Sequence, residues 1–420
     1  MPDTNMQIDI RSEIGVLEGV ILHTPGPEVE NMTPKNAERA LYSDILNLSE
    51  AEKEYTQFKT ILDKHATTFQ VSKLLRDILS EDEIKLNIVR RICTNENLFQ
   101  IHDTLLEMSS KELARTLIEG LELKRNNLTN FLSHERYILR PLHNFFFTRD
   151  AAMTIRNKVQ IGRMANKVRE REAIIMESIF NHHPVISTKT FNPINEINYD
   201  EKISIEGGDI LVARDDVIII GNSIRTSTQG IDYILERFKN KEDKRHIIVQ
   251  ELPSSPESFI HLDMTFTFLD VNKVMIYEPI ILNPNRYRTV HIEVDKGKVK
   301  IMEEKNILEV LSKLNFDVEP IYCGGTGDKW IQEREQWHSG ANFFAMAPGK
   351  IIGYGRNVYT LEEMNKHGFE IIKASDIISK KVDYTKYEKY VITIRSSELS
   401  RGGGGCRCMT MPIKRQPVSW

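Results

Sequence analysis

Apolar residues recur at helical spacing over one continuous stretch of the chain, residues 72–138. Residues three and four positions apart share one face of a helix, so this spacing predicts helices with one buried face. The first apolar stripe contains Leu74, Leu75, Ile78 and Leu79. Two capping boxes, Ser80 with Glu83 and Ser109 with Glu112, predict where further helices begin. We therefore expect residues 72–138 to form an all-helical insertion.

The remainder of the chain, residues 1–71 and 139–420, alternates short apolar runs with helical segments. Runs of mainly β-branched residues predict strands at 20–22, 210–212, 217–220, 247–249 and 274–277. The segment from Val294 to Val299 predicts a hairpin that turns at Lys296-Gly297. Alternation of strands and helices favours an α/β fold, and we expect these two segments to form the αβ domain that carries the site.

A degenerate repeat runs through this αβ part. Four places share one layout, in which a side chain with oxygen precedes a strand, a turn and a second strand. The residues at these places are Asp150, Asp209, Asp263 and Asn342. The units recur roughly every 55–80 residues, which is typical of radial repetition of a small unit. Equivalent strand starts converge in such an array, so we expect these four side chains to line a common central cavity.

Composition excludes several classes of function. The chain has 420 residues, 40% of them hydrophobic and 28% charged, with a formal net charge of −4. This balance gives no sign of nucleic-acid or anionic-lipid binding. No run approaches the ~18–20 apolar residues of a membrane span, and the polar start lacks a signal-peptide core. Four cysteines are too few for a disulfide scaffold, so we expect a cytoplasmic protein.

Near its end the chain carries four consecutive glycines and then a thiol, between Arg401 and Pro412. Ordering four glycines costs much conformational entropy, so a packed domain needs a reason to fix them. A flexible tail is the alternative, but the apolar residues Met409, Met411 and Ile413 favour docking. We expect the glycine run to cover a small ligand.

Four segments supply the candidate chemistry: 144–150, 206–209, 261–263 and the tail with Cys408. A histidine, a thiol and carboxylates are all metal ligands, but the spacing of these residues is unlike a metalloprotease motif, and we expect no metal or other cofactor. A catalytic pair in which Cys408 is the nucleophile and His261 the acid and base explains these residues more simply than a metal site does. Nearby carboxylates disfavour a thiolate, which is reasonable where the substrate is a cation such as a guanidinium. A hydrogen-bonded core role for His261 stays open here.

These segments resemble the arginine deiminase family, within the guanidino-modifying superfamily. The matching motifs follow the order of that family, at 15–26, 41–45, 146–150, 206–209, 225–226, 261–263, 334–337 and 407–412. They extend through nearly the whole chain, and as a set they are highly specific.

The resemblance implies a five-bladed αβ propeller with a helical insertion, and hydrolysis of L-arginine to L-citrulline and ammonia without a cofactor. It implies that Cys408 is the nucleophile and His261 the acid and base. Asp150 and Asp263 would grip the guanidinium, and Glu206 would hold it and orient His261. The positions that seat the rest of arginine, including its carboxylate, are matched by Asn144, Phe147, Arg169 and Arg225.

Three positions depart from the family pattern. Gly403 stands where a second arginine is common, which leaves Arg401 as the nearby basic residue for the substrate carboxylate. Ser43 stands where an acid is common, and Cys406 is unexpected two residues before the nucleophile.

Other functions in the superfamily stay open, namely an agmatine deiminase, an amidinotransferase or a non-catalytic arginine sensor. Arg169 and Arg225 favour a substrate with a carboxylate over agmatine. The presence of both Cys408 and His261 favours an enzyme over a sensor. We also expect a homo-oligomer that binds neither nucleic acid nor membrane.

Overall fold

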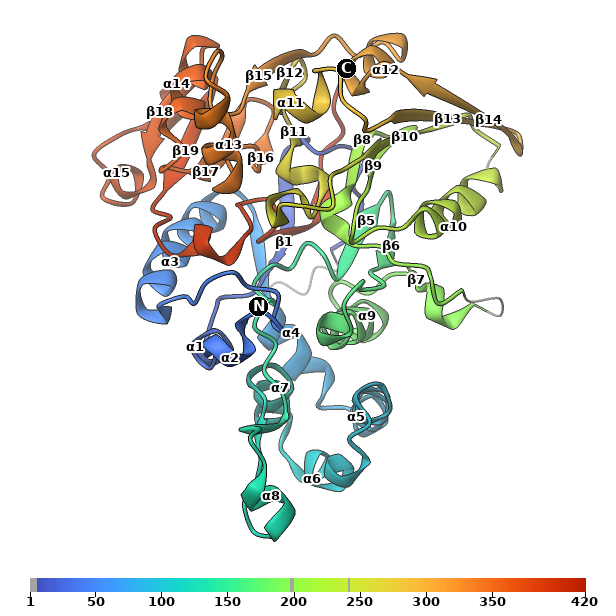
Figure 1. Ribbon diagram of the computed structural model, residues 1–420, viewed down its shortest axis with the longest axis vertical. Helices are drawn as coiled ribbons and strands as arrows, with labels where there is room; N and C mark the ends of the chain where they lie inside the picture. The colour runs from blue at the N-terminus through green and yellow to red at the C-terminus, as the bar shows by residue number, and fades with distance from the viewer. Residues whose placement is uncertain (1–5, 197–199, 241) are drawn as a thin grey trace.

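The computed structural model describes residues 6–196, 200–240 and 242–420, and its strands form several small sheets with helices around them (Figure 1). Five sheets contain a unit with one shared pattern. In each unit the first two strands are antiparallel and the second and third are parallel. A parallel pair needs a crossover connection, and helix lies between the second and third strands of every unit. The fold is therefore α/β, as predicted.

Four units follow one another along the chain, at the four places that the repeat predicted. The first contains β5 (Ala152–Ile155), β6 (Lys158–Ile161), α9 (Glu170–His182) and β7 (Thr190–Phe191). The second contains β8 (Ile210–Arg214), β9 (Val217–Asn222), α10 (Thr228–Lys239) and β10 (Arg245–Glu251). Its sheet is extended by β13 (Thr289–Asp295) and β14 (Lys298–Glu304).

The third and fourth units carry additional helices. The third contains β11 (Phe266–Asp270), β12 (Lys273–Ile276), α11 (Glu278–Ile281), α12 (Ile307–Lys313) and β15 (Glu319–Tyr322). After α13 (Lys329–Trp337), the fourth contains β16 (Phe344–Ala347), β17 (Lys350–Tyr354), α14 (Val358–Lys366), β18 (Glu370–Lys373), α15 (Ala374–Ile378) and β19 (Tyr390–Ile394).

The fifth unit joins the two ends of the chain. Its strands are β20 (Met411–Arg415), β1 (Leu17–Leu22) and β2 (Thr67–Gln70), and its main helix is α3 (Leu48–His65). The short helices α1 (Pro27–Glu30) and α2 (Pro34–Ala37) also follow β1. The residue repeat showed four units and missed this one, because its first strand lies at the end of the chain and its other two near the start.

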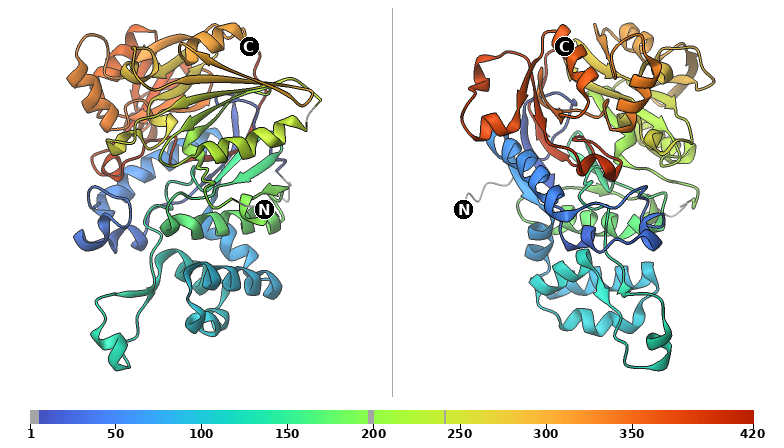
Figure 2. Two further views of the ribbon diagram at one scale, coloured as in Figure 1. Left: turned by 45° about the vertical axis from the view of Figure 1, so that its right-hand side comes forward. Right: turned by 60° about the vertical axis from the view of Figure 1, so that its left-hand side comes forward.

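The segment predicted to be helical contains α4 (Val71–Ile78), α5 (Asp82–Glu96), α6 (His102–Glu107), α7 (Ser110–Glu119) and α8 (Leu128–Leu132). It also holds a small hairpin of β3 (Leu121–Glu122) and β4 (Tyr137–Leu139). In Figures 1 and 2 most of this segment extends away from the sheets. Its buried residues share one apolar core with those of α9, β5 and β6. The division of the chain into two domains stays a prediction.

Of the two helix caps and the hairpin turn predicted from local sequence, the structure confirms one cap and the turn. Ser109 caps α7, where its Oγ accepts a hydrogen bond from the Glu112 amide at 3.3 Å. The capping box at Ser80 is wrong, because α5 begins at Asp82 after an N-cap residue that makes no side-chain cap. The hairpin of β13 and β14 turns at Lys296-Gly297 as predicted, with φ values of 48° and 79°.

None of the helices in the described ranges is both long and apolar enough to cross a membrane.

Candidate active site

The candidate site is built where the first strand of each unit begins. Asp150, Asp209, Asp263, Asn342 and Cys408 precede β5, β8, β11, β16 and β20 by two, one, three, two and three residues, respectively. Three of these side chains meet directly. Asn342 Nδ2 lies 3.3 Å from Cys408 Sγ and donates to the Asp263 carbonyl at 3.1 Å. The thiol thus occupies, in the fifth unit, the position that the repeat assigned to an acid or amide.

A cavity of about 430 Å³ lies at these strand starts. Most of the predicted site residues line it, namely Asn144, Phe147, Asp150, Arg169, Arg225, His261, Arg401 and Cys408. Glu206 and Asp263 are fully buried and contact the lining residues His261 and Cys408 from behind. Gly402, Gly403 and Gly404 form part of the wall. The glycine run therefore covers a cavity, as its composition predicted.

Cys408 is buried beside acids. Its Sγ lies 3.8 Å from Asp263 Oδ2 and 4.0 Å from Asp263 Oδ1. Burial, and then the charges of Asp263 and Asp150, raise the pKa of the thiol well above its usual value. Nearby Cys406 is also buried but does not line the cavity, and burial raises its pKa as well. The geometry thus distinguishes the two thiols by access to the cavity.

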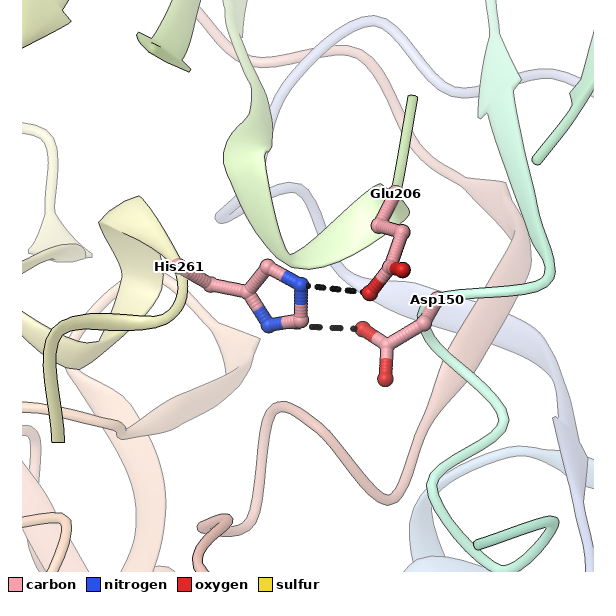
Figure 3. A group of neighbouring side chains, drawn as sticks. All are labelled: Asp150, Glu206 and His261. Carbon is pink, nitrogen blue, oxygen red and sulfur yellow. Dashed lines mark hydrogen bonds and ion pairs between the residues drawn. The ribbon is translucent and has the colours of Figure 1, made fainter. Parts of the chain in front are cut away.

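His261 points between two carboxylates that come from other units (Figure 3). Its Nε2 lies 2.9 Å from Glu206 Oε2, and its Nδ1 lies 3.7 Å from Asp150 Oδ1. Burial disfavours the imidazolium, but Asp150 and Glu206, with a further charge on Asp209, raise the pKa of His261 to about 9. Burial alone would raise the pKa of Glu206, yet its hydrogen bond to His261 and the charge of Arg225 lower it to about 2. The pair is thus an imidazolium and a carboxylate at neutral pH.

Asp150, Glu206 and His261 could in principle hold a metal ion, because their ligand atoms lie within 4.8 Å of one another. A ligating histidine must present a neutral nitrogen to the metal. Both ring nitrogens of His261 face carboxylates, which favours the protonated form. The cluster therefore fits a protonated histidine held by two acids better than it fits a metal ion.

The two aspartates predicted to grip the guanidinium each bind an arginine of the protein. Asp150 Oδ2 accepts from Arg169 Nη1 at 2.7 Å, whereas its Oδ1 has no hydrogen-bond partner among the described residues. Asp263 Oδ2 accepts from Arg407 Nη1 at 2.8 Å. A buried acceptor without a partner is costly, so Asp150 Oδ1 is placed to receive a donor from a ligand.

The three predicted basic residues lie in different environments. Arg169 is buried, although it lines the cavity, and it donates to Asp150, Glu172 and two carbonyls. Arg225 lies closer to the open cavity, with its Nη1 3.8 Å from Glu206 Oε1. Arg401 is 38% exposed and makes a bidentate pair with Asp44 at 2.7 and 2.8 Å. Of the three arginines, Arg225 is thus the one least engaged in contacts with other side chains of the protein.

Phe147 and the glycine run pack against each other. A Cβ atom on Gly404 would lie 2.6 Å from the Phe147 ring, so only glycine allows this approach. Gly403 has a φ of 79°, in the left-handed region that side chains rarely adopt. Its backbone conformation explains why glycine suits this position. The fifth predicted contact residue, Asn144, lines the cavity and donates its amide to the Ala40 carbonyl at 2.7 Å.

Three residues that the repeat placed in the cavity, Asp209, Asp263 and Asn342, do not line it, which corrects that expectation. Asn342 contacts Cys408 as described, and Asp209 connects two segments of the site. Asp209 Oδ1 accepts from the Leu262 amide at 2.9 Å, and its Oδ2 accepts from Ser223 Oγ at 2.6 Å. Ser223 Oγ accepts from the Arg225 amide at 2.9 Å. One buried carboxylate therefore positions the segments of His261 and Arg225.

The carboxyl group of Asp209 has a pKa close to neutral pH. Burial raises the pKa of this carboxyl to about 7, although the charge of His261 and the hydrogen bonds from Ser223 and Leu262 oppose the rise. The position in the repeat identified the residue, but sequence could not show whether its side chain faces the cavity or the neighbouring loops.

Comparison with known proteins gives a consistent result. Residues 38–415 match the family model "Arginine deiminase". Arginine deiminase of Listeria monocytogenes is 33% identical over 97% of this chain and 98% of its own length. Arginine deiminase of Bacillus cytotoxicus is 32% identical over 98% of this chain and 99% of its own.

Solved structures share the fold at low sequence identity. SxtG, an amidinotransferase from Microseira wollei, has a TM-score of 0.55 and 13% identity, with 98% of both chains covered. The N-terminal domain of ArgZ, a cyanobacterial arginine dihydrolase bound to substrate, has a TM-score of 0.53 and 12% identity, with 94% of this chain and 98% of that domain covered. These structures support the α/β fold.

Proposed function

This chain belongs to the arginine deiminase family, and from that premise we propose that it hydrolyses L-arginine to L-citrulline and ammonia. The observation that carries the proposal is the Cys408 thiol in a cavity surrounded by buried acids, 3.8 Å from Asp263. Such a site is poorly suited to a neutral acyl substrate, because nearby negative charge disfavours the thiolate. It suits a cationic guanidinium, whose planar donors match carboxylates and whose central carbon is an electrophile.

The reaction uses Cys408 and His261 in two stages. Binding of the cationic guanidinium favours the thiolate, so the Cys408 proton passes to solvent and the sulfur attacks the guanidinium carbon. An amino group of the adduct then takes a proton from the His261 imidazolium and leaves as ammonia. This leaves an amidino group bonded to sulfur. Neutral His261 then takes a proton from water as the water oxygen attacks the same carbon. As the C–S bond breaks, the adduct's hydroxyl group loses its proton to solvent, citrulline leaves and the thiolate is restored.

The carboxylates hold the substrate and stabilise its charge. Asp150 Oδ1, which faces His261 but accepts no hydrogen bond from the described residues, and the Oδ atoms of Asp263 accept from the guanidinium. Glu206 keeps His261 protonated and oriented. Arg225 binds the substrate carboxylate, with Arg401 as a second candidate at the rim. Asn144 and Phe147 line the path of the aliphatic chain. Arg169 supports Asp150 through its hydrogen bond to Oδ2.

The five repeated units are best explained as the blades of a five-bladed αβ propeller, with residues 72–138 inserted as a helical domain. This arrangement is supported by the contacts among Asp263, Asn342 and Cys408, which come from equivalent positions in three different units. A homo-oligomer and a cytoplasmic location stay predictions.

The test is to incubate the purified protein with arginine, with agmatine, and with arginine plus glycine as an amine acceptor. We expect citrulline and ammonia from arginine and little turnover of agmatine. Citrulline absent under every condition, with an amidino group transferred to glycine, would indicate an amidinotransferase. Arginine binding without any product would indicate a sensor.

A further inference from the structure

A second cavity, of about 580 Å³, lies next to the active site but on the side of the helical segment. Its wall is formed by the segment of α2 and the residues after it, by residues 134–141 and by the start of α9. Nothing in the proposed reaction uses this cavity. Its volume is within the range of small-molecule sites, which are about 300–1,000 Å³.

Cationic side chains predominate on this wall. Arg39, Arg136, Arg140, Lys167 and Arg171 line the cavity, against the acids Glu96, Glu135 and Glu172. One carboxylate, Glu135, is shared by Arg39 at 3.2 Å and Arg140 at 3.4 Å. Within the described part of the chain, Lys167 makes no ion pair. Arg136 pairs with Glu122, which lies outside the lining, so the surplus positive charge comes from Lys167 and from Arg39 and Arg140, which share one acid.

Arg171 is the most informative member of this group. It is only 2% exposed, and its Nη2 donates to the Arg140 carbonyl. Its Nε lies 3.2 Å from Glu96 Oε1. Its Nη1 has no hydrogen-bond partner among the described residues. A buried guanidinium with an unused donor is costly to maintain, and because Arg171 lines the cavity, an anion bound there would stabilise its charge.

We propose that this second cavity binds a phosphate-bearing small molecule. Guanidinium groups recognise phosphate oxygens through paired hydrogen bonds, and Arg39, Arg140 and Arg171 bring three of them to one space. Lys167 adds a mobile ammonium at the edge. The cavity is larger than a single phosphate needs, so both inorganic phosphate and a phosphorylated metabolite are tested below.

The site is separate from the active site but adjacent to it. Asn144 lines both cavities. Glu172 lines the second cavity and binds Arg169, which in turn binds Asp150 in the first. Citrulline should therefore leave the second cavity accessible, and it serves as a way to block the active site during the test.

The experiment is titration calorimetry of the whole protein, saturated with citrulline, using inorganic phosphate, pyrophosphate and ATP. We expect one molecule of pyrophosphate or ATP to bind per chain with a dissociation constant below about 1 mM. Similar affinity for all three probes would identify the phosphate group alone as the ligand. Tighter binding of ATP would identify a phosphorylated metabolite.

Matched variants locate the binding. Arg171→Gln, and separately the exposed double variant Lys167→Gln/Arg39→Gln, should each weaken binding about tenfold or more, because charge-assisted contacts are lost. Lys300→Gln on β14 removes one positive charge outside the cavity lining and should leave affinity within about twofold. If no probe binds, or if citrulline displaces it, or if the cavity variants bind as well as Lys300→Gln does, the proposal is wrong. Since arginine turnover is not the readout, failure here does not bear on the proposed reaction.

Discussion

The acidic and basic ends of the active-site cavity are built in different ways. At the acidic end, Cys408 and Asp263 are buried and stand just before the first strand of a unit. At the basic end, Arg225 lies on the segment between β9 and α10, and Arg401 lies on the segment before the glycine run. Arg401 is also substantially exposed.

This difference separates the chemistry from the recognition of the substrate. Strand starts are fixed by the ladder hydrogen bonds that follow them, so the reacting groups share the rigidity of the repeat. Segments that connect elements vary more readily and commonly carry specificity. We therefore expect changes at the acidic end to affect turnover of every guanidino substrate, and changes at the basic end to affect the choice among substrates.

The largest effect is expected at Cys408. Cys408→Ser should lower kcat by about 10⁴-fold or more, because hydroxyl is a far weaker nucleophile here. Cys406→Ser is the matched control and should keep most activity, since Cys406 does not line the cavity. Mass spectrometry of a quenched reaction should find the amidino adduct on Cys408, and an adduct on Cys406 would refute the assignment.

The next largest effect is expected at Arg225 and should differ between substrates. Losing one partner of a buried charge pair typically costs about 2–5 kcal/mol. Arg225→Ala should therefore reduce kcat/KM for arginine by that amount and change agmatine use much less. Arg401→Ala is the comparison at the exposed rim, where an ion pair is worth about 0–1 kcal/mol. An equal loss for arginine and agmatine in Arg225→Ala would show that this residue does not recognise the carboxylate.

Asp209 connects the acidic and basic ends of the cavity. Its loss should therefore lower activity toward arginine and agmatine alike. Asp209→Asn should lower kcat/KM by about 1–3 kcal/mol for both arginine and agmatine, because an acceptor that holds the Leu262 amide is weakened. Ser223→Ala keeps that bond and removes only the link to the Arg225 segment, so its defect should be confined to arginine. The readout is the ratio of the two kcat/KM values together with the thermal midpoint.

A pH profile separates this positioning role from general loss of stability. Because the pKa of Asp209 is raised to about 7, its carboxyl group loses its proton as the pH rises through neutrality. The wild-type profile should contain a step in this region that Asp209→Asn lacks. A mutant profile of unchanged shape would indicate that Asp209 contributes to folding alone.

Local patterns and the family motifs named most of the residues that the structure brings together around the cavity. A short polar residue before an alternating apolar run marked Asp150 and Asp263, and both lie beside the predicted nucleophile or acid. The glycine run predicted a covered cavity, which Gly404 and Phe147 form. The turn at Lys296-Gly297 could be predicted because few residues other than glycine favour the positive φ angles that it needs.

Sequence could not predict features that depend on which side chains meet across units. The hydrogen bonds of Arg169 to Asp150 and Glu172 depend on tertiary geometry, which a motif match does not show. The same holds for the pairing of Arg401 with Asp44. The fifth unit was missed for a related reason, because β20 finds its partners at the opposite end of the chain.

The smallest effect we expect is a pH difference between two alkylating reagents, and it follows from the charge of the acidic end. Burial and the charges of Asp263 and Asp150 raise the pKa of Cys408, so the free protein holds a thiol at neutral pH. A neutral reagent such as iodoacetamide should react slowly until the pH is well above 7. A cationic amidine such as chloroacetamidine reverses the local field when it binds, favours the thiolate and should react at lower pH. Throughout this range His261, with a pKa of about 9, stays protonated and does not withdraw the thiol proton. If iodoacetamide already reacts at its full rate near pH 6, the free protein holds a preformed thiolate, and activation by the substrate's charge is excluded.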